Sequence, residues 1–182
     1  MRTALLLLGF AVSLGVRVVI GGDAVAQSVT AGLVFAAALL ALSVASRTRV
    51  LVSKRALLIG VAGVVLVCLP VALEQAVSLR PLRTTDGFAT WALAVTAVAV
   101  SEEVFLRGAL YESVDGWRGP VSAVAVGAVC FALLHVPLYG WHVVPLDLAV
   151  GVVLGGLRHA SGTPLAPAVT HAGADLVGWF VS

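Results

Sequence analysis

Residues 56–73 read ALLIGVAGVVLVCLPVAL, a run in which no side chain carries a charge. The run extends to residue 76, and Glu74 is its first charged side chain. A helix that crosses a bilayer needs about 20 predominantly apolar residues. Barrel strands alternate between apolar and polar residues, and this run does not. It therefore predicts a transmembrane helix, the element that satisfies its own backbone hydrogen bonds in lipid.

The rest of the chain has a similar composition. Of its 182 residues, 60% are hydrophobic and 11% are charged, and the mean hydropathy is +1.10. A soluble domain carries about 25% charged residues, so this chain cannot cover a water-facing surface, and it is too apolar to be disordered. A net charge of +2 without a clustered basic patch gives no reason to expect nucleic acid. The expected class is an integral membrane protein in contact with the lipid bilayer.

Seven apolar segments predict an all-α, polytopic helical bundle. They cover about 3–20, 24–46, 56–76, 88–114, 120–138, 143–160 and 164–182. Turns are expected between them, including one over 115–120 that ends in a helix-starting proline. We expect a single transmembrane domain over 1–182, in a multi-pass protein of the cell membrane.

The basic residues predict how the bundle is oriented. Cytoplasmic loops carry an excess of Lys and Arg. With a cytoplasmic N-terminus, the inside set is Arg2, Arg47, Arg49, Lys54, Arg55, Arg118 and Arg158. The outside set is Arg80 and Arg83. The N-terminus is therefore expected inside and the C-terminus outside.

Six ionisable residues fall deep within three of the segments. They are Glu102, Glu103 and Arg107 in the fourth, His135 in the fifth, and His171 and Asp175 in the seventh. Such groups are expensive in lipid and usually functional. At about 1.5 Å per residue, Glu102 lies roughly 20 Å before the Asp115 turn, His135 roughly 22 Å after Pro120 and His171 roughly 14 Å after Gly162. The six groups are therefore expected in one layer.

Spacing suggests how these residues pair. Glu103 and Arg107 are four residues apart in the order that favours an ion pair, as His171 and Asp175 are on their own helix. Glu102 is turned about 100° from Glu103, which leaves His135 as its nearest candidate partner. Phe131 stands one turn before His135.

Other ionisable residues are expected to have simpler roles. Arg17 lies near the outer end of the first segment, where a long side chain can reach the interface. Asp147 lies in the first turn after Pro145, where a carboxylate suits a helix N-terminus.

Three motifs occur in order: EExxxR over 102–107, FxxxH over 131–135 and HxxxD over 171–175. With them, the chain resembles the CPBP family, also called the Abi family. This family includes CAAX prenyl endopeptidases of the Rce1 type and bacteriocin-processing and immunity proteins. The resemblance covers about 88–180, and the three helices of 1–87 carry no motif.

The resemblance implies an intramembrane endopeptidase that acts on a membrane-associated peptide or protein through glutamate-activated water, without a cofactor. Glu102 would be the general base, working with His135. His171 and Asp175 would stabilise the oxyanion, and Glu103 and Arg107 would support the site. The family commonly has Asn where this chain has Asp175. An ionised Asp cannot donate a hydrogen bond, so Asp175 is either protonated or orients His171.

Three alternatives remain. Glu102, His135 and His171 could bind zinc in a metal-dependent membrane protease, although the resemblance favours a metal-free site. A non-catalytic immunity or scaffold protein of the same family could retain these residues. Buried Glu and His chains also form proton or solute pathways, although pathway residues should be staggered through the membrane.

Overall fold

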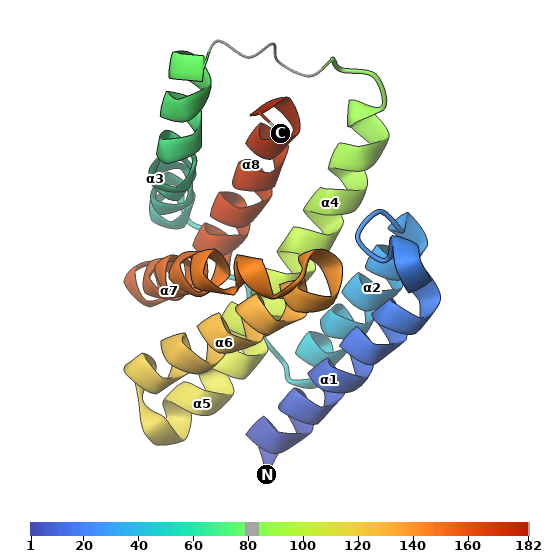
Figure 1. Ribbon diagram of the computed structural model, residues 1–182. Coiled ribbons are helices and arrows are strands. Elements are labelled where there is room, and N and C mark those ends of the chain that lie inside the picture. The colour runs from blue at the N-terminus through green and yellow to red at the C-terminus, as the bar shows by residue number, and fades with distance from the viewer. Residues whose placement is uncertain (79–83, 182) are drawn as a thin grey trace.

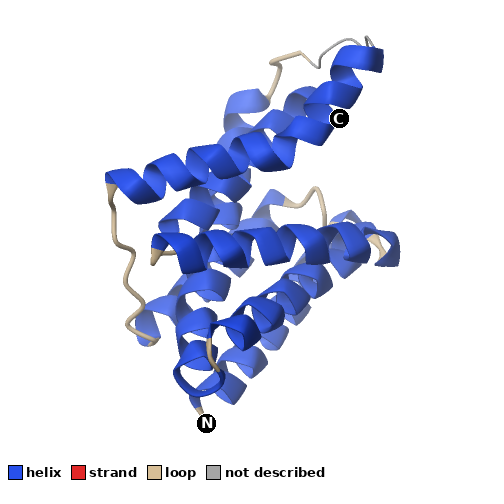
Figure 2. Cartoon of the chain, turned by 90° about the vertical axis from the view of Figure 1, so that its left-hand side faces the viewer, coloured by secondary structure: helices blue, strands red, loops and turns tan. Residues whose placement is uncertain are grey.

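The computed structural model describes residues 1–78 and 84–181, and within them the chain is helical with no strand. Figure 1 shows the arrangement of the helices, and Figure 2 the same bundle from the side. The main elements are α1 Arg2–Gly21, α2 Val29–Ala45, α3 Lys54–Ser78, α4 Phe88–Glu103, η2 Val104–Leu110, α5 Tyr111–Arg118, α6 Pro120–Tyr139, α7 Val144–Ser161 and α8 Leu165–Val181. Short 3₁₀ turns occur at η1 Gly22–Ala24 and η3 Trp141–Val143. Since α4, η2 and α5 are continuous, the predicted all-α bundle of seven helical segments is confirmed.

Five of these segments are long and apolar enough to cross a membrane, namely Arg2–Ala24, Lys54–Ser78, Phe88–Arg118, Pro120–Tyr139 and Trp141–Ser161. α2 is apolar but has 17 residues, as α8 does over its described length. Large apolar side chains such as Leu5, Leu58 and Val61 are exposed, while Glu103 and Arg107 are buried. A soluble protein has the opposite arrangement, with large apolar side chains inside and charged ones outside. The exposed apolar surface therefore places the protein in a membrane. The two predicted outside charges, Arg80 and Arg83, lie outside the described residues.

Two predicted boundaries were wrong. The turn expected over 115–120 is confined to Gly119, because α5 continues through Arg118 and α6 starts at Pro120. Gly119 has φ of 79°, a backbone conformation that favours glycine. The second segment, predicted from residue 24, begins at Val29 after the η1 turn. Its start is fixed by Ser28, whose Oγ accepts a hydrogen bond from the Ala31 amide at 3.2 Å.

α8 is the central helix of the bundle and packs against α3, α4 and α7. α6 packs against α5 and α7, while α2 lies between α1 and α4. Small residues allow the close approaches. A Cβ on Gly151 of α7 would come 2.8 Å from the Ala128 Cα of α6. A Cβ on Gly63 of α3 would meet the side chain of Thr170 on α8. Such small-residue contacts let membrane helices pack through their backbones.

The EExxxR motif spans a change of helix type. Glu102 and Glu103 end α4, and Arg107 lies in η2, a π-helix. π-Helical turns within longer helices are rare and frequent at functional sites. All residues of η2 after Val104 are buried, so this wider turn lies in the middle of the bundle.

Candidate active site

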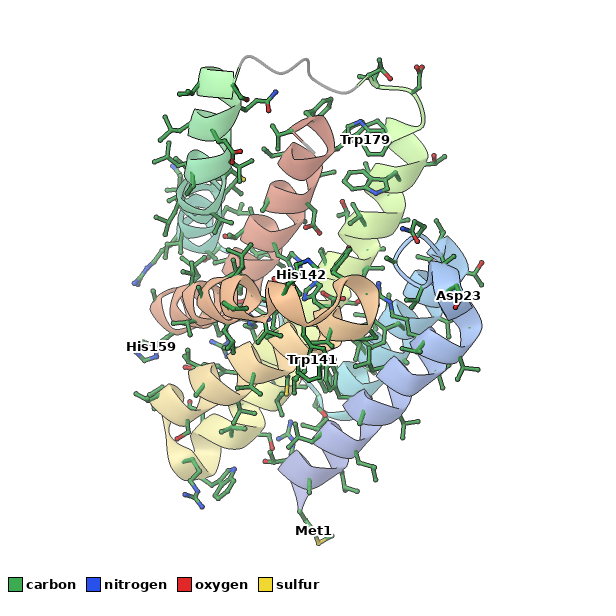
Figure 3. All side chains as sticks on the ribbon, viewed as in Figure 1. Met1, Asp23, Trp141, His142, His159 and Trp179 are labelled. Atoms are coloured by element: carbon green, nitrogen blue, oxygen red, sulfur yellow. The ribbon has the colours of Figure 1, made fainter. Side chains whose placement is uncertain are left out.

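A cavity of about 560 Å³ lies between α1, α2, α4, α6 and α8. Glu102, His135 and Asp175, each from a different motif, line it together with Arg17. An aromatic pair borders the cavity, because Trp91 and Trp179 both line it with ring centroids 4.8 Å apart. Figure 3 shows Trp179 between α8 and α4. The fold therefore brings parts of all three motifs to one hollow.

Glu102 is 2% exposed and pairs with Arg17 across the bundle. Arg17 Nη1 donates to Glu102 Oε1 at 3.4 Å. Arg17 itself is only 6% exposed, and its guanidinium lies over the Phe35 ring of α2, 5.0 Å from the centroid. The prediction that Arg17 reaches the interface was therefore wrong. Buried charges in proteins are normally paired, and Glu102 supplies the partner.

Glu103 is fully buried, and one of its oxygens accepts two hydrogen bonds. Arg107 Nη1 donates to Glu103 Oε1 at 2.9 Å, which is the ion pair predicted from their spacing. His171 Nδ1 lies 3.1 Å from the same oxygen. Arg107 Nη2 donates to the Gly151 carbonyl at 3.2 Å, so the pair ties α4 and η2 to α7 and α8.

His171 lies between two carboxylates. Its Nδ1 faces Glu103, and its Nε2 is 3.6 Å from Asp175 Oδ2. The second separation is longer than a hydrogen bond. His171 is 8% exposed and is not among the residues that line the cavity, whereas Asp175 is. Asp175 therefore lines the cavity wall, and Nε2 of His171 adjoins it.

His135 is held by the backbone of its own helix. Its Nδ1 lies 3.0 Å from the Phe131 carbonyl oxygen, which can only accept. Nδ1 must therefore carry the proton, and Nε2 of the neutral ring is an acceptor. Asp147 of α7 approaches the same Nδ1 at 3.6 Å, and its Oδ2 is buried without a hydrogen bond within the described residues. The partner expected from the sequence, Glu102, lines the same cavity but makes no hydrogen bond with His135.

Phe131 packs between the charged groups. Its ring is edge-on to His135 and to His171, at centroid distances of 4.7 and 5.2 Å. The Arg107 guanidinium lies 4.9 Å from the Phe131 centroid. The ring thereby packs against both histidines and offers its face to the Arg107 guanidinium.

The residues of the zinc alternative do not gather around one point. Across residues 1–78 and 84–181, no three His, Cys, Asp or Glu side chains lie close enough to hold a metal ion. Of the three candidate ligands, Glu102 faces a guanidinium, His171 faces Glu103, and His135 donates to a carbonyl. This arrangement does not fit a preformed zinc site.

Sequence reasoning missed two residues at the site, Arg17 and Asp147. A signal for Arg17 exists, because Ser13 and Arg17 are polar residues four apart in an apolar helix and thus share a face. Leu6 and Phe10 lie on that buried face as well. For Asp147, the first-turn position was correct, but the sequence does not reveal its approach to His135.

A family model described as "Type II CAAX prenyl endopeptidase Rce1-like" matches residues 84–177, just over half of the chain. The chain belongs to the Rce1-like family. This confirms the resemblance drawn from the three motifs and makes the protein a member of a family of membrane proteases. The Rce1-like segment runs from the start of α4 into α8 and includes Glu102, His135 and His171, whereas Arg17 lies outside it. No curated protein and no solved structure matches the chain significantly.

Proposed function

We propose that the protein is a multi-pass endopeptidase of the cell membrane, of the CAAX-protease or bacteriocin-processing type. It would hydrolyse a peptide bond of a membrane-associated substrate with water activated by Glu102. The observation that carries the proposal is the shared cavity, in which Glu102, His135 and Asp175 meet inside a member of a protease family.

Glu102 is suited to act as the general base. One of its oxygens is paired with Arg17, and within the described residues the other makes no hydrogen bond and is left for water. In the proposed reaction, Glu102 takes a proton from water and the hydroxyl oxygen adds to the peptide carbonyl carbon. The proton then passes to the leaving nitrogen as the C–N bond breaks. A base must reach its proton directly or through one water, and Nε2 of His135 supplies an acceptor that can orient that water.

His171 and Asp175 are proposed to stabilise the oxyanion. Since His171 Nδ1 donates to Glu103, its Nε2 can donate to an oxyanion only in the doubly protonated ring. The 3.6 Å gap to Asp175 leaves Nε2 without a close acceptor. A fixed donor in a dry cavity stabilises developing negative charge more than one in water. Asp175 would then orient His171 and would not donate itself.

Glu102→Gln tests the proposal. Candidate membrane substrates are co-expressed with the wild type, with Glu102→Gln and with Glu74→Gln, an exposed control on α3. General-base catalysis contributes about 10²–10⁴-fold, so cleavage should fall by at least that factor in Glu102→Gln and be unchanged in the control. Normal cleavage by Glu102→Gln would show that this is not a glutamate protease, and a complete absence of cleavage by the wild type would favour the non-catalytic alternative.

Metal dependence is measured on the same preparations. Activity that survives exhaustive chelation, in purified protein without stoichiometric zinc, supports water activation by glutamate alone. Loss of zinc and activity together, both restored by added zinc, would instead establish a metal-dependent protease.

A further inference from the structure

Arg17 belongs to a helix that the family model does not match, yet it contacts the proposed base. The family match starts at residue 84, and α1 ends at Gly21. An arginine inside a membrane helix is costly even on the lenient insertion scale. Its position within the bundle therefore calls for a specific contact.

The contacts of α1 define where Arg17 lies. Phe10 stacks on Phe105 of η2, with ring centroids 5.8 Å apart and planes 8° apart. Seven residues later, two helical turns along the same face, Arg17 meets Glu102. Glu102 precedes Phe105, so α1 runs antiparallel to the motif helix and touches it at both points.

The guanidinium is fixed on two sides. Phe35 lies under it and Glu102 Oε1 accepts from Nη1. Arg17 Nε is buried and has no hydrogen-bond partner within the described residues. Across residues 1–78 and 84–181, Glu102 is the carboxylate that pairs with the Arg17 guanidinium.

We infer that Arg17 is a positioning residue for Glu102, so that α1 forms part of the catalytic unit. This inference rests on the proposed function. Arg17 holds one oxygen of the carboxylate and keeps Glu102 oriented with its other oxygen available for water. It supplies positive charge beside the base from outside the three motifs. Arg17 acts through Glu102.

The test compares Arg17→Met, Arg17→Lys and the control Arg2→Met. Arg2 lies at the other end of α1, is exposed and donates to the Ser46 carbonyl, so the control removes an interhelical arginine away from the cavity. Misplacing a catalytic group can cost about 10²-fold in rate. We expect kcat to fall by about that factor in Arg17→Met with KM unchanged, to recover partly in Arg17→Lys, and to be unaffected in Arg2→Met.

A double-mutant cycle that combines Arg17→Met with Glu102→Gln, measured by melting temperature, provides a readout that does not need a substrate. The melting temperatures of Arg17→Met, Glu102→Gln and the double variant should be non-additive, because each single change leaves one buried charge unpaired. If Arg17→Met fails to purify, recovery of folded protein in the double variant shows the same coupling.

Three results would overturn the inference: additive melting temperatures, a rise in KM with normal kcat, or a Lys variant no better than Met. If the wild type cleaves nothing, the catalytic part of both proposals fails. The cycle then still decides whether Arg17 holds Glu102.

Discussion

His171 and Arg107 converge on a single atom of Glu103. Oε1 lies 3.1 Å from His171 Nδ1 and 2.9 Å from Arg107 Nη1, and Glu103 is fully buried. The neighbouring Glu102 instead faces the cavity and pairs with α1. The adjacent glutamates therefore have different surroundings, one enclosed by the motif helices and one facing the cavity.

Glu103→Gln should destabilise the protein. The change leaves Arg107 without its charged partner, and breaking a buried pair from one side costs about 3–5 kcal/mol. We expect a lower melting temperature in detergent and lower expression. The double variant Glu103→Gln with Arg107→Met should recover part of the loss, since it removes both charges. A stable but inactive Glu103→Gln beside a fully active Glu102→Gln would reverse the roles of the two glutamates.

His135→Ala should slow cleavage without unfolding the protein. If His135 Nε2 orients the attacking water, its loss should lower kcat by about 10²–10⁴-fold. His142 is the matched control, because it is exposed on the η3 turn and lies outside the residues that line the cavity. Equal activity of the two alanine variants in a cleavage assay would remove His135 from the mechanism.

Gly63→Ala should disturb α8 from outside the motif segment. A Cβ at this position would clash with Thr170, whose Oγ1 donates to the Gly60 carbonyl at 2.9 Å. Thr170 directly precedes His171. Overpacking typically costs about 1–3 kcal/mol, so the melting temperature should fall. Gly156→Ala is the control, since nothing lies within 4 Å of its Cβ position. Identical melting curves for the two variants would contradict this packing.

The predicted orientation can be read by cysteine labelling. In a chain whose Cys68 and Cys130 are replaced, Val52→Cys sits in the exposed loop before α3, and Asp23→Cys lies at the opposite end of α1 from Met1 (Figure 3). An N-terminus in the cytoplasm predicts that a membrane-impermeant reagent added to intact cells labels Asp23→Cys and leaves Val52→Cys unlabelled. The reverse pattern would invert the topology.

Local spacing predicted much of the architecture. The run over 56–73 specified a lipid-facing helix, and it lies within α3. The ion pair between Glu103 and Arg107 was predicted from their spacing of four residues, and it forms as expected. Such features depend on a single helix, so one stretch of sequence contains all the information that they need.

Features that join distant helices were harder to predict. Arg17 and Glu102 are 85 residues apart, and their contact depends on how α1 packs on α2 and η2. The π-helix over Val104–Leu110 has no evident marker in an apolar sequence. The helix continues past Asp115, where a turn was predicted, because the short polar helix α5 of eight residues extends the apolar helix formed by α4 and η2.

Apart from α4, which lines the cavity from Trp91 to Glu102, the cavity draws on the same end of each helix: the last turns of α1, α6 and α8 and the first half of α2. In the orientation predicted from the basic residues, this end faces away from the cytoplasm. A substrate segment would then approach Glu102 from the side of the bundle opposite the cytoplasm, and the depth of Glu102 within α4 would require that segment to enter the membrane.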